Sequence, residues 1–307
     1  MSPDRQSDEP TSAKPGERPA VIVISSHVAR GSVGIRAAGF ALEARGHPVW
    51  TVPTVSLPYH PGHGRSTRIV PDPEQFRQFL DDLASSPWIN EVAAVLTGYM
   101  ADAAQAEAVA GFVTRLKQEN SSLICLCDPV IGDAGGLYVS TEVALTIRDR
   151  LLPLADIATP NLFELAWLVA GDMDAPADLP RAAQMARNLP SPATIVTSAP
   201  AFMRGNIASL YCDGGQALAA EHRRIDGAPS GTGDLFSALF LSHTLAGTEP
   251  PRALERAAAS TFEVIAQSVR AGSDELIAER CIGSLQRPMA MVTMRSLAAA
   301  ETAPRPA

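Results

Sequence analysis

A glycine-rich segment, Pro229-Ser230-Gly231-Thr232-Gly233-Asp234, leads into a long apolar helical stretch and is the strongest candidate for chemistry in the chain. Its two glycines allow the backbone to curl tightly, so that consecutive N–H groups point at one spot at the positive end of the helix. Such an anion hole suits a phosphate, or the charge that develops on a phosphoryl group in transfer. Asp234 would be a base aimed at a nearby hydroxyl group, or it would only complement the helix dipole.

Two further acidic segments follow predicted strands. Cys127-Asp128-Pro129-Val130 leads into a glycine loop that contains Asp133, and Thr159-Pro160-Asn161 precedes Glu164. Carboxylates at strand ends suit Mg²⁺, which takes one or two of them together with phosphate oxygens and waters. Both segments also have structural interpretations, because Asp-Pro favours a turn and Asn161 with Glu164 can cap a helix.

The other polar motifs are less specific. The loop at residues 25–34 is rich in small residues but lacks the Gly-x-Gly-x-x-Gly spacing of a dinucleotide site. Tyr99, at a predicted strand end, could stack on a flat ring or belong to the core. His60 and His63 lie in a proline-rich loop without a cysteine or a paired acid cluster nearby, which argues against a metal site there.

Composition argues against several classes of protein. The chain has 307 residues, of which 46% are hydrophobic and 19% charged, so it can bury a substantial core. Its net charge is −8 and it has no basic block, which disfavours binding to nucleic acid. Lysine occurs only at Lys14 and Lys117, and neither is placed for a Walker loop, a protein-kinase site or a pyridoxal-phosphate Schiff base.

The apolar runs and the cysteines of the sequence indicate the cellular location of the protein. No run of 18 apolar residues occurs, which predicts that no segment spans a membrane. The first 19 residues lack the apolar centre of a signal peptide, and the four cysteines form no disulfide framework at this length. We therefore expect a soluble, cytoplasmic protein.

Short apolar runs alternate with helical patterns along most of the chain, so the motifs must be positioned by an α/β fold. Strands are predicted over 20–25, 49–55, 92–96, 123–127, 156–158 and 194–197, with helices between them and over 234–246 and 252–269. This alternation predicts a parallel sheet with helices on both faces, while 207–212 and 216–221 predict a β-hairpin. Ligands bind such sheets at the carboxyl ends of the strands, where most of these motifs lie.

The predicted domain organisation is simple. Residues 1–19 are expected to form a disordered tail, residues 20–287 one domain, and residues 288–307 a flexible C-terminal tail. No internal repeat and no linker divides the chain.

Taken in order, these segments resemble the pyridoxal kinase family of the ribokinase-like superfamily. Each segment alone is weak or moderate, but six in order are specific, and the Ser-His-Val opening is typical of pyridoxal kinases rather than sugar kinases. The resembling segments, between about Val21 and Arg270, are Ser26 to Gly34, Thr97-Gly98-Tyr99, Cys127-Asp128-Pro129-Val130, Gly132-Asp133 with Tyr138-Val139, Ala155 to Asn161 with Glu164, and Gly231 to Phe236.

The resemblance implies a three-layer ribokinase-like sandwich, with a mostly parallel central sheet, helices on both faces and the β-hairpin near one edge. It implies ATP-dependent phosphorylation of the 5′-hydroxyl of pyridoxal, and usually of pyridoxine and pyridoxamine. The family uses Mg²⁺, typically K⁺ as an activator, and usually forms homodimers.

The resemblance also implies roles for individual residues. Asp234 would be the base, and Gly231, Thr232 and Gly233 would form the anion hole. Ser26 would hydrogen-bond the pyridine ring. Leu57-Pro58-Tyr59-His60 stands where the family commonly has Phe-Ser-Asn-His, so Leu57 replaces an aromatic side chain while His60 is kept. The remaining implied residues are Val33 and Tyr99 around the ring, Asp133, Tyr138, Thr159, Glu164, Thr197, Ser198 and Thr232 around the nucleotide, and Asp133 and Glu164 near Mg²⁺, directly or through water.

Two alternatives stay open. A hydroxymethylpyrimidine kinase of the same superfamily usually carries a cysteine where this chain has Asp234, so the aspartate favours pyridoxal. A catalytically silent B6-binding protein would be favoured by loss of Asp234 or of the anion-hole glycines, all of which are present.

Overall fold

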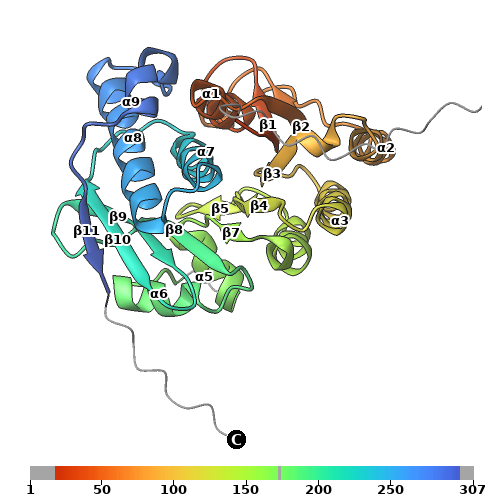
Figure 1. Cartoon of the computed structure of the whole chain (residues 1–307). Helices are drawn as coiled ribbons and strands as arrows, with labels where there is room; N and C mark the ends of the chain where they lie inside the picture. Colours follow the sequence, from red (N-terminus) through yellow and green to blue (C-terminus); the bar gives the residue numbers. More distant parts are fainter. Residues whose placement is uncertain (1–17, 172–173, 298–307) are drawn as a thin grey trace, which may run out of the picture.

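The computed structural model describes residues 18–171 and 174–297 and has a nine-stranded central sheet (Figure 1). The strand order is β11-β10-β9-β8-β7-β4-β3-β1-β2. Neighbouring strands from β2 to β8 are parallel, and β8 to β11 are antiparallel. The strands are β1 (Ala20–Val28), β2 (Val49–Leu57), β3 (Val92–Thr97), β4 (Ile124–Cys127), β7 (Ile157–Ala158), β8 (Ala193–Ala199), β9 (Asn206–Cys212), β10 (Ala217–Arg223) and β11 (Thr293–Ser296).

The sheet is buried on both faces because its central strands are continuous apolar runs. In β1, Ile22 and Ile24 enter one hydrophobic core, whereas Val21 and Val23 enter the other, as the two-residue period of a strand requires. All four side chains are fully buried. The sheet therefore has a hydrophobic core on each face, as the predicted three-layer arrangement requires.

Helices cover each face. The core with Ile22 contains side chains of α2 (Pro73–Ala84), α3 (Ala103–Glu119), α4 (Thr141–Thr146), α5 (Leu162–Ala170) and α6 (Leu179–Ala186). The core with Val21 contains those of α1 (Ile35–Ala44), α7 (Thr232–Leu245), α8 (Pro250–Arg270) and α9 (Ile282–Gln286). Short helical segments complete the structure: the 3₁₀ segments η1 (Pro61–His63), η2 (Ile89–Glu91), η4 (Leu152–Leu154) and η5 (Ala278–Arg280), and the π-helical segment η3 (Ile147–Leu151). A small hairpin is formed by β5 (Gly132–Asp133) and β6 (Gly136–Leu137).

The predicted flexible tail at 288–307 is wrong for part of its length. Residues Thr293–Ser296 form β11, which pairs antiparallel with β10 and closes that edge of the sheet. The strand is short and mostly polar, with only Met294 packed against the core, so its sequence carries no apolar run to reveal it. The predicted β9–β10 hairpin is present next to this edge. Residues 298–307, and residues 1–17 of the predicted N-terminal tail, lie outside the described part of the chain.

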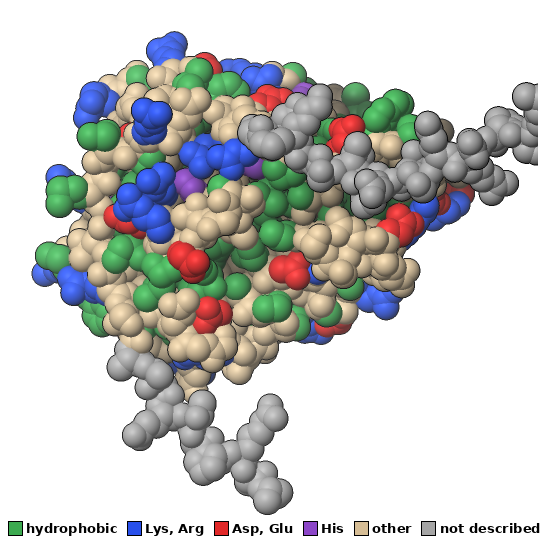
Figure 2. Space-filling model, viewed as in Figure 1, with side chains coloured by type: hydrophobic (Ala, Val, Ile, Leu, Met, Phe, Trp, Pro, Cys, Tyr) green, Lys and Arg blue, Asp and Glu red, His purple; other side chains and the backbone are tan. Residues whose placement is uncertain are grey.

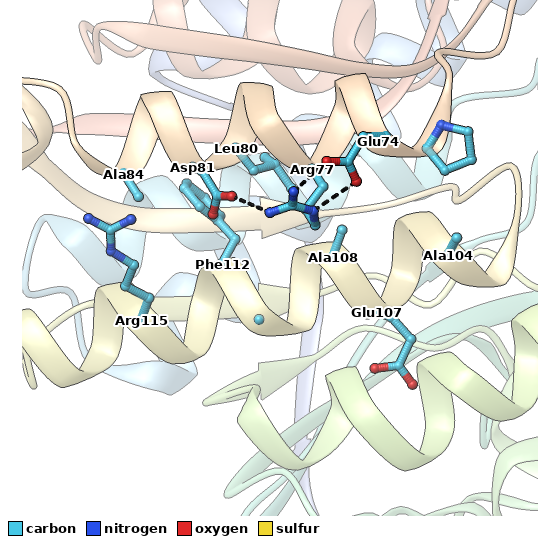
Figure 3. Close-up of a pocket in the computed structure, with 12 residues that line it drawn as sticks. Glu74, Arg77, Leu80, Asp81, Ala84, Ala104, Glu107, Ala108, Phe112 and Arg115 are labelled. Atoms are coloured by element: carbon cyan, nitrogen blue, oxygen red, sulfur yellow. Dashed lines mark hydrogen bonds and ion pairs between the residues drawn. The ribbon is translucent and has the colours of Figure 1, made fainter.

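A groove of about 800 Å³ lies between α2 and α3 (Figure 3). Its lining includes the small residues Ala104, Ala108 and Gly111. Arg77 lies between Glu74 and Asp81 and pairs with both. None of the site residues predicted from the sequence lines it, so groove size does not locate the candidate site. None of the helices in the described ranges is long and apolar enough to cross a membrane.

Candidate active site

Two glycines bring the start of α7 against the loop that follows β1. Gly231 caps α7 with φ +94°, and a side-chain carbon added there would lie 2.1 Å from the carbonyl oxygen of Ser32. Gly34 has φ +55°, and an added carbon would lie 2.2 Å from the carbonyl oxygen of Ser26. Only glycine fits both positions, because each combines a positive φ with a backbone contact that leaves no room for Cβ. The predicted anion-hole segment is thus in direct contact with the first loop.

Asp234 lies at this junction. Its Oδ2 accepts a hydrogen bond of 2.9 Å from the Gly34 N–H. The carboxyl group is surrounded by protein atoms but keeps part of its surface accessible, and removal from bulk water raises its pKa to about 6. The Gly34 N–H and the backbone N–H of Asp234 itself oppose that rise. A carboxyl group with such a pKa suits general base chemistry near neutral pH.

Asp128 and Glu164 are two buried carboxyl groups close to each other, and Asp128 is also close to Asp234. Burial, followed by the charges of Glu164 and Asp234, raises the pKa of Asp128 well above its usual range. Burial also raises the pKa of Glu164 to about 7, although three backbone N–H groups oppose the shift. Within residues 18–171 and 174–297, no basic side chain forms an ion pair with any of these three acids. The site is therefore short of positive charge, as a site that receives a cation would be.

A buried hydroxyl network supports Asp128. Its Oδ2 accepts a hydrogen bond of 3.0 Å from the Ser237 hydroxyl, which is hydrogen-bonded to Thr159 at 2.8 Å. The predicted nucleotide residue Thr159 is thus tied to α7 and to the end of β4. Sequence reasoning missed Ser237, because a serine inside an apolar helix carries no local signal of such a role.

Glu164 has the structural role that the sequence left open. It forms a capping box with Asn161, whose side chain accepts from the Glu164 N–H at 2.9 Å while Glu164 Oε2 accepts from the Asn161 N–H at 2.8 Å. Its Oε1 accepts from the Ile131 N–H at 2.8 Å. The side chain therefore joins the start of α5 to the loop after β4. Its predicted place near Mg²⁺ stays a prediction.

Glu164→Gln is expected to lower the free energy of unfolding by about 1–3 kcal/mol, because the new NH₂ group would face backbone N–H donors. We also expect a higher Mg²⁺ concentration at half-maximal activity. Urea unfolding and a Mg²⁺ titration at fixed ATP measure the two effects. Asp72→Asn is the matched control, since Asp72 caps α2 through the N–H groups of Glu74 and Gln75. Reduced stability with an unchanged Mg²⁺ titration would limit Glu164 to capping.

The remaining predicted nucleotide residues lie on the loops after β4 and at the end of β8. Asp133 and Tyr138 are close together, and partial removal of the Tyr138 side chain from water, with the hydrogen bond and charge of Asp133, raises the pKa of Tyr138. Thr197 forms a β-bridge with Asn161, and Ser198 beside it has φ +56°. Val130, after β4, has φ +38°. Strained backbone of this kind at non-glycine residues is typical of functional sites.

A small apolar cluster lies apart from the two main cores. It consists of Val28, Val33, Val55 and Leu57, with Tyr99 and Ala101 packed against it. Three residues predicted to contact the acceptor ring, Val33, Leu57 and Tyr99, are thus brought together. Ser26 lies beside them, since its Oγ would be 2.5 Å from a side-chain carbon added at Gly34.

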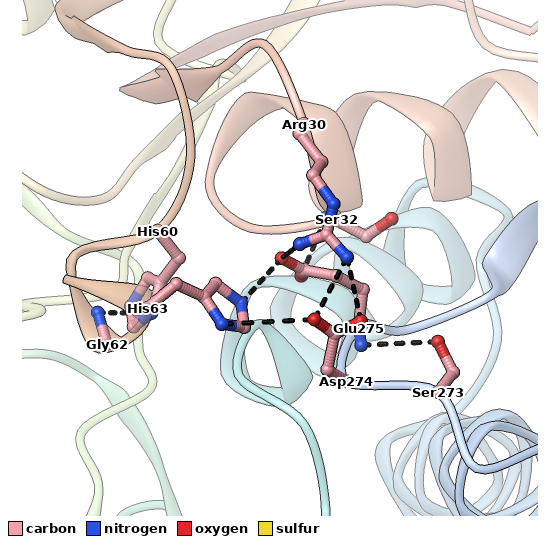
Figure 4. Close-up of polar contacts among 8 residues, drawn as sticks. All are labelled: Arg30, Ser32, His60, Gly62, His63, Ser273, Asp274 and Glu275. Carbon is pink, nitrogen blue, oxygen red and sulfur yellow. Dashed lines mark hydrogen bonds and ion pairs between the residues drawn. The ribbon is translucent and has the colours of Figure 1, made fainter. Parts of the chain in front are cut away.

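An ionic clamp ties the loops around this cluster to the segment after α8 (Figure 4). We define the clamp as Arg30, His63, Asp274 and Glu275. Glu275 accepts from His63 Nε2 at 2.9 Å and from Arg30 Nη1 at 3.3 Å. Arg30 Nη2 also donates to both Asp274 oxygens, at 2.8 and 2.9 Å. Sequence reasoning missed the clamp, because Arg30 and His63 lie more than 200 residues before Asp274 and Glu275, and Asp274-Glu275 resembles an ordinary polar loop.

His60 does not belong to the clamp. It caps η1 through a 3.1 Å hydrogen bond from the Gly62 N–H, and its ring lies 6.4 Å from that of His63. Burial, with the neighbouring His63, lowers its pKa despite the opposing charge of Glu275. Its predicted place near the acceptor stays a prediction.

The mostly parallel sheet between two helical layers, with a glycine-lined helix start that carries an aspartate in its first turn, defines a ribokinase-like α/β protein. The family model described as phosphomethylpyrimidine kinase matches residues 70–278. Pyridoxal kinase PdxY from Corynebacterium diphtheriae is 32% identical over 260 residues, covering 84% of this chain and 92% of the relative. The pyridoxine/pyridoxal/pyridoxamine kinase of Bordetella bronchiseptica is 36% identical, covering 84% of this chain and 92% of the relative.

A solved structure agrees with these relatives. Pyridoxal kinase from Leishmania donovani, in complex with ADP and pyridoxine, superposes with a TM-score of 0.83 at 29% identity, covering 91% of this chain and 99% of that chain. The chain belongs to the pyridoxal kinase family, and the predicted fold class is confirmed.

Proposed function

We propose that this protein transfers the γ-phosphoryl group of ATP to the 5′-hydroxyl of pyridoxal, and also of pyridoxine and pyridoxamine. The observation that carries the proposal is the position of Asp234, which is bonded to the Gly34 N–H and follows the Gly231–Gly233 segment directly. A base and a set of backbone donors are thereby fixed side by side. The names of the relatives, and the ADP and pyridoxine in the Leishmania structure, support the same reaction.

Asp234 and the start of α7 would divide the chemistry between them. The N–H groups of Gly231, Thr232 and Gly233 would offset the charge that develops on the transferring group. Phosphoryl transfer passes through a loose transition state, so the hydroxyl proton leaves late. A carboxylate within hydrogen-bond reach, such as Asp234, is then a sufficient base.

Mg²⁺ would enter as part of the MgATP substrate. The described residues contain no group of three His, Cys, Asp or Glu side chains that could hold a metal ion. Mg²⁺ prefers to bind one or two protein carboxylates together with phosphate oxygens and waters. The buried acids Asp128 and Glu164 fit that part, with Asp133 nearby through water.

The apolar cluster would hold the pyridine ring, with Leu57 in the place of an aromatic side chain and Ser26 as a hydrogen-bonding partner. A hydroxymethylpyrimidine acceptor remains the rival, and the family model's description supports it. Asp234 favours the B6 vitamers, as do the pyridoxal kinases that the chain matches over 92% of their length.

The test is ADP release from MgATP with pyridoxal, pyridoxine, pyridoxamine and hydroxymethylpyrimidine as parallel acceptors. Turnover with the B6 vitamers and not with the pyrimidine is the expected result. Turnover with the pyrimidine alone would overturn the proposal. Binding of pyridoxal without turnover for any acceptor would identify a silent B6-binding protein instead.

Glu275→Gln is expected to raise KM for pyridoxal about tenfold while kcat changes less, because a charged hydrogen-bonding partner contributes about 1.5–3 kcal/mol. Glu275 is 7% exposed and packs under Gly31, so its loss loosens the loop that carries Val33. Asp274→Asn is the control, since that side chain is 57% exposed and its ion pair should contribute little. Equal KM values in the two variants would contradict a positioning role for Glu275.

Three further properties stay proposals that rest on the family: a homodimer, activation by K⁺ and a cytoplasmic location. Sedimentation equilibrium tests the first, since a monomer at micromolar concentration would contradict it. Assays in K⁺ and in Na⁺ at equal ionic strength test the second.

A further inference from the structure

A second cavity, of about 260 Å³, lies between the start of α8 and the segment after α9, and its charged lining consists of three arginines and Glu255. Arg252 and Arg256 line it from successive turns of α8, and Arg287 faces them from the other side. The wall near Arg287 is held in place because Glu263 accepts from the Met289 and Ala290 N–H groups. We call this cavity the arginine pocket.

The arginine pocket has more positive charge than its surroundings neutralise. Arg252 pairs with Glu255, Nη1 to Oε2 at 2.5 Å. Arg256 and Arg287 have no hydrogen bond or ion pair from their side chains within the described ranges. Figure 2 shows blue Lys and Arg side chains gathered over α8 and beside α1, with histidine among them. Because the whole chain has a net charge of −8, this patch is not a consequence of a generally basic surface.

The dipole of α8 adds to the positive charge of the arginine pocket. Pro250 begins α8, so Arg252 and Arg256 lie in its first two turns, where the helix dipole is already positive. Basic side chains at that end destabilise a helix, and Glu249 at the N-cap makes no side-chain capping bond. An anion in the pocket would offset this unfavourable positive charge.

His243, at the end of α7, lies close enough to these arginines for their charge to affect its ionisation. The residue is 1% exposed, its Nδ1 is paired with Arg45 Nη2 at 3.2 Å, and its buried Nε2 has no partner. Burial lowers its pKa to about 3, with help from the charges of Arg45, Arg256, Arg18 and Arg252. Of these arginines, Arg252 is paired with Glu255, whereas Arg256 has no acidic partner within the described ranges, so unbalanced positive charge lies close to the buried ring.

We propose that the arginine pocket binds a small phosphate-bearing anion, either inorganic phosphate or a phosphate monoester. Guanidinium groups bind phosphate through paired N–H donors, and three from two segments can surround one phosphate group. The cavity is below the roughly 300 Å³ of pockets for drug-sized ligands, which suits a phosphate with a small organic part. His243 lies nine residues beyond Asp234, about 13 Å along α7, so the pocket is separate from the active site.

The test follows the side-chain signals of His243 in ¹⁵N-histidine-labelled protein while inorganic phosphate or pyridoxal 5′-phosphate is added. Sodium chloride at equal ionic strength is the control for screening. The expected result is saturable movement of the His243 signals with one midpoint, which rises at least tenfold in Arg256→Gln/Arg287→Gln. The double variant Arg224→Gln/Arg280→Gln removes the same charge from surface pairs elsewhere and should keep the original midpoint.

Equal midpoints in the two double variants, or equal movement with chloride, would overturn the proposal. Equal affinity for both phosphates would show that the phosphate group alone is recognised, whereas tighter binding of pyridoxal 5′-phosphate would identify a monoester site. Turnover without added phosphate should be the same in all proteins, which separates this site from the proposed reaction.

Discussion

Replacing Asp234 with asparagine is expected to lower kcat by about 10²- to 10⁴-fold, the range for loss of a positioned base. Asparagine keeps the size of the side chain, and its amide oxygen can still accept from the Gly34 N–H. It cannot take the proton of the acceptor hydroxyl. Single-turnover kinetics measures the chemical step, and MgATP binding by calorimetry should be unchanged.

The same substitution should not weaken the fold. Burial raises the pKa of Asp234 to about 6, so the ionised carboxylate destabilises the folded state at neutral pH. The Tm of Asp234→Asn should therefore equal or exceed that of the wild type at pH 7.5. A lower Tm together with weaker MgATP binding would mean that the activity was lost through misfolding.

The pH dependence has a definite sign. The folded pKa lies above the ordinary value of 3.8, so the contribution of Asp234 to stability is fully present below about 4 and is lost as pH rises through about 6. The advantage in Tm of Asp234→Asn should grow over that window. Over the same pH range wild-type turnover should rise, because the base must be ionised. Turnover that is independent of pH between 5 and 7 would remove Asp234 from the role of base.

Gly231→Ala has the second large expected effect, a loss in kcat of roughly 10²- to 10³-fold, as for removal of an oxyanion donor. The added methyl group would overlap the Ser32 carbonyl oxygen, so the start of α7 must move away from the first loop. That movement displaces both the N–H groups of the anion hole and Asp234. Steady-state kinetics with saturating substrates measures the loss.

Gly227→Ala is the matched control for that experiment. Gly227 also has a positive φ, +75°, but a side-chain carbon added there meets no atom within 4 Å. Both variants carry the cost of about 1–2 kcal/mol for a left-handed alanine, whereas only Gly231→Ala carries the collision. Similar kcat values in the two variants would contradict the importance of the junction.

Local signals in the sequence predicted most of the fold. The Asp72-Pro73 pair marks the start of α2, since Asp72 caps the helix and Pro73 occupies its first turn, and the amphipathic pattern follows from there. The strand β1 is equally clear from its apolar run. The strand β11 was not predictable in this way, because pairing with β10, rather than its own side chains, makes it a strand.

In the candidate site, too, local motifs were predictable from the sequence and long-range contacts were not. The Gly231–Asp234 segment and the acids after β4 and β7 lie in short motifs, so their types and spacing pointed to phosphate chemistry. The contact of Gly231 with Ser32, the bond from Ser237 to Asp128 and the clamp around Glu275 join distant segments. Such contacts depend on tertiary packing and leave no pattern in a single sequence.

The position of β11 in the sheet has a consequence for synthesis of the protein on the ribosome. Thr293 comes 70 residues after Arg223, the last residue of β10. At about 5–20 residues per second, β10 waits roughly 4–14 seconds for its outer partner. During that interval its alanine-rich edge presents unpaired N–H and C=O groups to other nascent chains. Slow translation of the last segment would therefore favour aggregation of a chain whose proposed catalytic residues have already been made.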